Sequence, residues 1–188
     1  MDENQKKILE TVIVEFNNKG MKFTMDDVAK DLHMSKKTIY KEFGDKEDLF
    51  NKMVDYCFSS IKEKEAEILQ DPNLSTIERI SKLLVCLPDN YQHVDFRKIY
   101  QVKDKYPNIY ARVAQRIESD WDETIALLEK GMDEGVIKRI PIPVIKLVVE
   151  ASIEKFLTSE TLIETGTNYE DALGIMIEML MNGIATGK

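Results

Sequence analysis

The stretch that decides the fold is FTMDDVAKDLHMSKKTIYKEF, residues 23–43. Thr24 and Ser35 each precede a short pattern of apolar residues at helical spacing, and hydroxyl side chains there cap helix starts. Two aspartates follow Thr24, where acidic groups favour the helix dipole. The spacing therefore predicts two short helices joined by a tight turn at residues 32–34, which is a helix-turn-helix.

Apolar residues at chosen positions would hold these two helices at a fixed angle. Ala29 is small where the helices must cross closely, and Met34 and Ile39 would fill the space between them. Phe43 continues the buried side of the later helix, and Gly44 ends it. This pattern leaves the opposite side of that helix for solvent or a partner.

Basic and hydroxyl side chains occupy that opposite side. Lys37 and Lys41 are four residues apart, as are Lys36 and Tyr40, so they line adjacent rows of one face. Lysine and tyrosine suit contact with phosphates, and lysine also donates to guanine edges in the major groove. Only one carboxylate, at the far edge, interrupts the face.

Hydroxyl groups at the start of the same helix add to this chemistry. Ser35 and Thr38 are placed to reach phosphates through hydroxyl and backbone N–H groups. The alternative is an ordinary solvated helix face. The combination of caps, a small crossing residue, a turn and a short basic helix favours binding to nucleic acid.

Residues 24–49 resemble the DNA-binding domain of the tetracycline-repressor (TetR) family. The shared pattern is Thr24, Val28-Ala29, Ser35, Thr38-Ile39-Tyr40, Phe43 and Lys46-Glu47-Asp48-Leu49. The resemblance implies a homodimeric regulator, usually a repressor, that binds a palindromic double-stranded DNA operator and is released by a small-molecule effector. It also implies that the helix at residues 35–43 enters the major groove.

The resemblance assigns roles to individual residues. Thr24, Tyr40 and Lys46 correspond to phosphate anchors, whereas Lys36, Lys37 and Lys41 are expected to contact base edges or the groove. Two positions depart from the pattern, because His33 and Lys37 stand where glycine is common. His33 is expected in a turn position that can require positive φ, which histidine tolerates better than most residues. A phosphate contact by His33 is the other possibility.

Composition and charge agree with a regulator that uses a local DNA-binding patch. The chain has 188 residues, 43% of them hydrophobic and 32% charged, and a net charge of −8. Residues 19–46 carry seven lysines against five acidic residues, so the rest of the chain carries −10. No apolar run approaches the ~20 residues of a membrane span, and the first residues lack a signal-peptide layout. We expect a cytoplasmic protein without a membrane partner.

The whole chain reads as all-α, with about nine helices. The expected helices lie near residues 3–18, 24–32, 35–43, 45–70, 75–87, 90–104, 107–131, 143–160 and 169–185. We expect a helix-turn-helix DNA-binding domain at residues 1–48 and a helical regulatory and dimerisation domain at 49–188. The boundary would fall within a continuous helix and not in a flexible linker.

The helices at 143–160 and 169–185 are apolar over more than one narrow stripe. Such helices must be covered on two sides. A partner copy would supply one cover, which gives a four-helix bundle between subunits and a homodimer. The alternative is that both helices are entirely internal.

Residues from the fourth to the seventh expected helices are candidates for an effector pocket. Apolar walls with a few tyrosine hydroxyls suit a lipophilic or aromatic effector, although ordinary core packing is the alternative for each residue. The candidates are Phe58, Ile61, Leu83, Cys86, Leu87, Tyr91, Phe96, Tyr100, Tyr110, Val113, Ile117 and Trp121.

Catalytic and metal-binding motifs are not evident. The two histidines, His33 and His93, are far apart, and there is no CxxC, HExxH or glycine-rich phosphate loop. Cys57 and Cys86 lie in apolar helical patterns, which favours packed thiols over a redox switch. We expect no metal, no cofactor and no enzymatic activity. An enzyme whose site is built only in space and a protein-binding helical adaptor are the alternatives.

Overall fold

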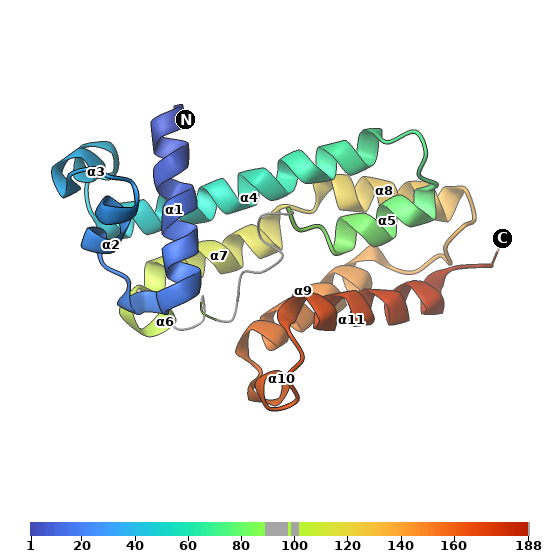
Figure 1. Cartoon of the computed structure of the whole chain (residues 1–188). Coiled ribbons are helices and arrows are strands. Elements are labelled where there is room, and N and C mark those ends of the chain that lie inside the picture. Colours follow the sequence, from blue (N-terminus) through green and yellow to red (C-terminus); the bar gives the residue numbers. More distant parts are fainter. Residues whose placement is uncertain (89–97, 99–101, 188) are drawn as a thin grey trace. The chain divides into compact units, whose positions relative to one another are not determined.

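The computed structural model describes residues 1–88, 98 and 102–187 of the chain (Figure 1). The helices are α1 (Glu3–Lys19), the 3-10 turn η1 (Gly20–Lys22), α2 (Met25–Asp31), α3 (Lys36–Phe43), α4 (Lys46–Gln70), α5 (Thr76–Leu84), α6 (Val102–Lys105), α7 (Pro107–Ser119), α8 (Asp122–Asp133), α9 (Ile142–Thr158), α10 (Glu160–Glu164) and α11 (Tyr169–Ile184). Over the described ranges there is no named strand, only an isolated bridge between Ile137 and Ala185. The all-α prediction is confirmed.

Two compact units make up the chain. One contains Met1–Ser59 with Val94–Gln115, and the other contains Ser60–His93 with Arg116–Lys188. The expected functional division at residue 48 concerns DNA binding and regulation, and it stays a prediction. No described helix is both long and apolar enough to cross a membrane.

Side-chain caps set the starts of the helices in the N-terminal unit. The Thr24 and Asp27 side chains form a reciprocal capping box at α2, and the Ser35 hydroxyl accepts from the Thr38 amide at α3. The Asp45 carboxylate accepts from the Asp48 amide at 2.8 Å, ahead of α4. These predicted helix starts are confirmed, because each depends on residues only three apart.

Aromatic rings fill the core of the N-terminal unit. The ring of Phe50, a fully buried residue of α4, lies 5.7 Å from the Phe16 ring and 5.5 Å from the Phe23 ring. Its ring is also 5.7 Å from that of Tyr106, which follows α6. Aromatic pairs at this separation stabilise the fold by more than the burial of their apolar area alone. Phe50 therefore joins α1, the loop before α2, α4 and the end of α6.

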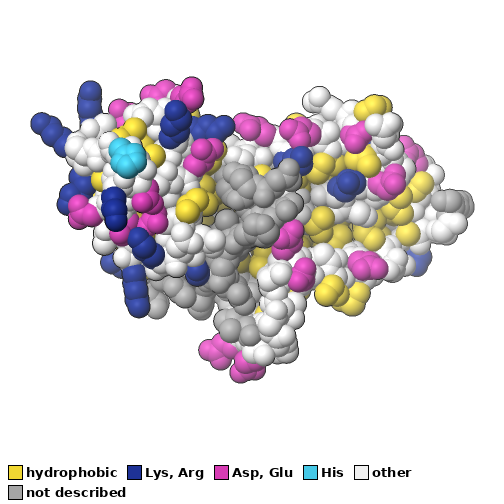
Figure 2. All heavy atoms as spheres, viewed as in Figure 1, with side chains coloured by type: hydrophobic (Ala, Val, Ile, Leu, Met, Phe, Trp, Pro, Cys, Tyr) yellow, Lys and Arg dark blue, Asp and Glu magenta, His cyan; other side chains and the backbone are white. Residues whose placement is uncertain are grey.

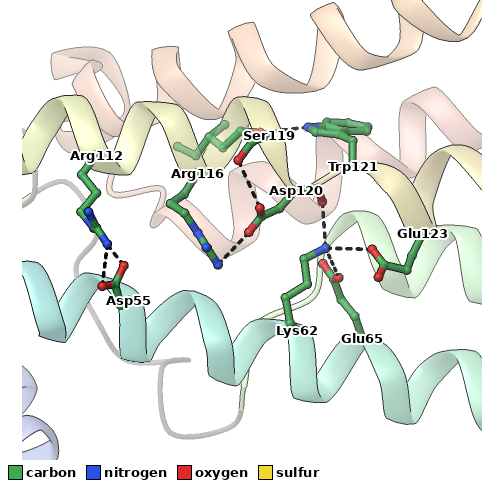
Figure 3. A network of polar contacts seen from close by, with 10 residues as sticks. Asp55, Lys62, Glu65, Arg112, Arg116, Ser119, Asp120, Trp121 and Glu123 are labelled. Atoms are coloured by element: carbon green, nitrogen blue, oxygen red, sulfur yellow. Dashed lines mark hydrogen bonds and ion pairs between the residues drawn. The ribbon is translucent and has the colours of Figure 1, made fainter.

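The prediction of a single helix at residues 107–131 is wrong, because the structure has two helices there, α7 and α8, with a short interruption between them (Figure 3). The indole of Trp121 donates to the Ile117 carbonyl at 2.9 Å, which takes the bond that the Trp121 amide would make in a continuous helix. The Asp120 carbonyl accepts from Lys62 Nζ at 2.8 Å. Asp122 and Glu123 then begin α8, where acidic groups favour the helix dipole.

Helices α5, α8, α9 and α11 form the core of the second unit, with α5 packed on α8 and α11 packed on α5 and α9. A Cβ on Gly131 would lie 2.9 Å from Ile80 Cδ1, so glycine permits the close approach of α8 to α5. The helix expected at 90–104 lies mostly outside the described residues, and α6 is its described end. Helix α10 was not expected.

Candidate nucleic-acid interface

The turn between α2 and α3 has the geometry that the sequence predicted. The Met34 amide donates to the Ala29 carbonyl at 2.9 Å, and the His33 amide donates to the Lys30 carbonyl at 3.2 Å. His33 has φ of 52°, so the expectation of positive φ at this position is confirmed. Ala29 is buried at the crossing with α3. The turn therefore holds α3 at a set angle to α2.

Replacing His33 by glycine should raise the free energy of unfolding by about 0.5–1 kcal/mol. Glycine removes the backbone strain of positive φ, and this gain is larger than the entropic cost of ordering the more flexible glycine chain. Replacing it by valine should lower the same quantity by about 1–2 kcal/mol, because β-branched residues rarely enter the left-handed region. Urea unfolding of the two variants measures both. Equal stability of the glycine and valine variants would contradict the strained turn.

Helix α3 buries one side and exposes the other. Ile39 and Phe43 are almost fully buried. The exposed residues are Lys36, Lys37, Thr38, Tyr40 and Lys41, all of which the sequence singled out for DNA contact. Figure 2 shows lysine and arginine side chains gathered over the part of the molecule formed by α1–α3. We call the outward side chains of Lys37, Thr38, Tyr40 and Lys41 the reading face.

The carboxylate nearest the reading face is held by α1. Glu42 is half-buried, and its Oε2 accepts from Gln5 Nε2 at 3.3 Å. At the start of α3, the hydroxyls of Ser35 and Thr38 lie 2.8 Å apart and are hydrogen-bonded to each other. Lysine charges and hydroxyl groups therefore dominate the outward side of α3, which suits it to an anionic surface.

Two of the expected DNA contacts already have partners within the chain. Lys36 Nζ forms an ion pair with the Asp26 carboxylate at 3.0 Å, and both side chains are well exposed. The Thr24 hydroxyl donates to Asp27 Oδ2 at 2.8 Å. Exposed pairs of this kind are worth roughly 0–1 kcal/mol, so a phosphate can compete for Lys36.

Lys46 is the most enclosed of the expected phosphate anchors. Its Nζ donates to the Phe23 carbonyl at 2.6 Å and lies 4.0 Å from the centre of the Phe23 ring. Burial, and then the nearby charge of Lys105, lower the pKa of the Lys46 ammonium below its ordinary value. Lys46 thus ties α4 to the loop before α2, in addition to any contact with DNA.

Several of the expected DNA-contacting side chains line a surface hollow of about 740 Å³ in the N-terminal unit. Its lining combines α3, the loop before α2, the start of α4 and the end of α6. We call it the lysine hollow, and it is lined by Met21, Lys22, Phe23, Thr24, Met25, Asp26, Lys36, Tyr40, Lys46 and Lys105. Sequence reasoning missed Lys22 and Lys105. Lys22 lies within the basic segment that the sequence showed, whereas nothing in the sequence indicates that Lys105 lies near Tyr40.

A network of charges fixes α1 to α2 behind this surface. Lys19 Nζ lies 2.8 Å from Asp27 Oδ1 and 2.6 Å from Glu15 Oε2. The hydrogen bond to Lys19 lowers the pKa of Asp27, and the bond to Asp27 raises the pKa of Lys19. Asp27 also completes the cap of α2, so this carboxylate stays ionised and in place.

The expected effector residues divide between the two units. Tyr91, Phe96 and Tyr100 lie outside the described residues. Leu83 and Trp121 are buried in the core of the second unit, and Phe58, Tyr110 and Val113 belong to the N-terminal unit. The half-buried members in the second unit are Ile61, Cys86, Leu87 and Ile117. Binding of an effector by this set stays a prediction.

The thiol of Cys86 should be unreactive at neutral pH. Its Sγ lies 3.9 Å from the Ile61 carbonyl, and burial raises its pKa to about 11. In a Cys57→Ser variant, alkylation of Cys86 at pH 8 should be more than about 100-fold slower than that of an exposed cysteine. The rate should climb about tenfold per pH unit up to pH 11. Rapid alkylation at pH 8 would restore the redox interpretation.

Comparison with known proteins gives a consistent result. A family model described as bacterial regulatory proteins, tetR family, matches residues 8–53. The uncharacterized HTH-type transcriptional regulator YvaF of Bacillus subtilis is 24% identical, over 95% of this chain and 94% of the relative. The HTH-type transcriptional repressor NicS of Pseudomonas putida is 24% identical, over 73% and 65%. A crystal structure of a TetR transcription regulator from Haloarcula marismortui shares the fold, with a TM-score of 0.74 at 13% identity and coverage of 99% and 100%.

Proposed function

Because a model of the tetR family of bacterial regulatory proteins matches residues 8–53, we propose that the chain is a TetR-family repressor that binds a palindromic operator as a homodimer. A small, largely apolar effector would release it, and its place of action would be the cytoplasm. Members of this family are DNA-binding regulators, not enzymes, which sets the enzyme alternative aside.

The reading face is the observation that carries this proposal. Lys37 and Lys41 project from an eight-residue helix whose other side is locked in the core by Ile39 and Phe43. A rigid helix with outward lysines and hydroxyls matches a major-groove helix, in which base edges and flanking phosphates are both within reach. Thr24, Ser35, Lys36 and Lys46 would contact phosphates beside it.

An exposed apolar surface on α9 and α11 supports the homodimer. In α9, Ile145 and Val149 are buried, whereas Val144, Leu147 and Val148 are exposed. In α11, Ile175 and Met179 are exposed on a helix whose other apolar residues join the core. We call these five exposed side chains the apolar surface. Large exposed apolar residues at helical spacing mark an interaction site, and a second copy would cover them in a four-helix bundle.

Effector control is supported by the resemblance to the TetR family. A coupling of ~1–3 kcal/mol between effector and operator would weaken DNA binding by about 5–150-fold. One structural relative is a ketosteroid transcriptional regulator of Mycobacterium tuberculosis. The proposal of an apolar effector for this chain rests on the apolar side chains among its candidate pocket residues.

Selection from random double-stranded DNA by the full chain tests the proposal. The selected sequences should contain a palindrome with half-site centres about 10 bp, or a multiple of that, apart. Enrichment of no sequence, or of single-stranded species, would overturn it. A protein-binding adaptor would show no enrichment.

A further inference from the structure

Lys105 brings a positive charge to the lysine hollow from outside the helix-turn-helix. It is the last residue of α6, and it lines the hollow together with Tyr40 of α3 and Lys46 of α4. All three belong to the N-terminal unit, although Lys105 comes from the later of the two chain segments that make up that unit. The hollow is therefore built by two distant segments of chain.

Packing of aromatic rings sets the position of Lys105. The Tyr106 amide donates to the Val102 carbonyl at 2.7 Å, and the Tyr106 ring lies against the fully buried Phe50. Lys46 Nζ lies 4.0 Å from the Phe23 ring centre and 5.8 Å from that of Phe50. Lys105 Nζ is 5.6 Å from the Tyr106 ring centre. The ammonium groups of Lys46 and Lys105 therefore both lie against rings of the same aromatic cluster.

Positive charge in the lysine hollow exceeds its negative charge. Among the described lining residues, four are lysines and one is a carboxylate, Asp26, which is paired with Lys36. The charge of Lys105 disfavours protonation of Lys46, which means that the two ammonium groups repel each other. An anion between them would relieve that repulsion. Lys46 uses one of its three N–H donors for the Phe23 carbonyl, so two are left for such an anion.

We propose that Lys105, with Lys46 and Tyr40, binds a backbone phosphate of the operator, so that α6 forms part of the DNA interface. This rests on the proposed function. Charge complementarity supports a DNA phosphate as the occupant, and so does continuity with α3, since Lys36 and Tyr40 of that helix line the same hollow. The DNA-binding surface then extends beyond the domain expected at residues 1–48.

The test compares Lys105→Gln with Lys103→Gln in the full chain. Lys103 is on the same short helix, but its Nζ lies over the Tyr110 ring and it does not line the hollow. Affinity for the selected operator is measured from 50 to 200 mM salt. Loss of one phosphate contact in each subunit of the dimer should reduce the magnitude of the log–log salt slope by about 1.8 and weaken binding about 10- to 100-fold near 100 mM salt. Lys105→Arg should keep the wild-type slope.

Thermal unfolding of the same variants distinguishes a phosphate contact from a structural role. Lys105→Gln removes a repulsive charge, so its melting temperature should equal or exceed that of the wild type. A wild-type salt slope in Lys105→Gln, or equal losses in the Lys103 and Lys105 variants, would overturn the proposal while leaving the proposed function intact. No binding by the wild-type chain would overturn both.

Discussion

Replacing Leu147 and Met179 together by glutamate should convert the protein from a dimer to a monomer and weaken operator binding by at least about 100-fold. The two side chains are 64% and 65% exposed in the single chain, and they belong to the apolar surface on α9 and α11. In a dimer, each glutamate would be buried against apolar groups, where an unpaired charge costs several kcal/mol. A monomer retains one reading face and loses the avidity of two linked contacts.

Light scattering after size-exclusion chromatography measures the mass, and operator titration measures the affinity. Ala126→Glu is the control, because Ala126 is an exposed residue on α8 in the same unit and is not part of the apolar surface. It should stay dimeric and bind normally. Circular dichroism should show that the double variant keeps its helices. A double variant that is still dimeric at the same concentration would place the dimer interface elsewhere.

The second large effect concerns the reading face. Reversing the charges of Lys37 and Lys41 with glutamate in both subunits should weaken operator binding at least about 100-fold near 100 mM salt and reduce the magnitude of the salt slope by about 3.6. Both side chains are exposed on α3, and glutamate at either position would face phosphates with a like charge. Fluorescence anisotropy with a labelled operator duplex measures affinity and slope together.

Lys82→Glu with Lys130→Glu is the matched control, because it changes the net charge equally at exposed positions of α5 and α8. If this control loses as much affinity as the α3 double variant, the effect is one of overall charge and the assignment of the reading face fails. Lys37→Ala alone separates two roles. A change in base preference of about 1–3 kcal/mol indicates a base contact, whereas a uniform loss indicates a phosphate contact.

The structure divides the four lysines at residues 36–46 into two groups. Lys37 and Lys41 point outward from α3, whereas Lys36 and Lys46 have partners in the lysine hollow, Asp26 and the Phe23 carbonyl. The sequence could not make this division, because it depends on which acceptors folding brings close. Any contact of Lys46 with DNA would accordingly depend on the packing of α4 against the loop before α2.

Local signals explain what the sequence predicted well. Capping at Thr24, Ser35 and Asp45 and the positive φ at His33 depend on neighbours within three or four residues. The break between α7 and α8 depends in part on Lys62, whose Nζ reaches the Asp120 carbonyl from 58 residues away. The contribution of Lys105 to the hollow is likewise long-range. Apolar periodicity was continuous across the break, so it could not reveal the change of direction.

Titration of the wild-type chain with the selected palindrome and with a scrambled duplex of equal composition tests the central claim most directly. The account predicts a dimer that binds the palindrome at least about 1,000-fold more tightly than the scrambled duplex. Its affinity should fall steeply with salt, because α3 and the lysine hollow contact phosphates. Equal affinity for the two duplexes, or binding that salt does not weaken, would contradict operator recognition through α3.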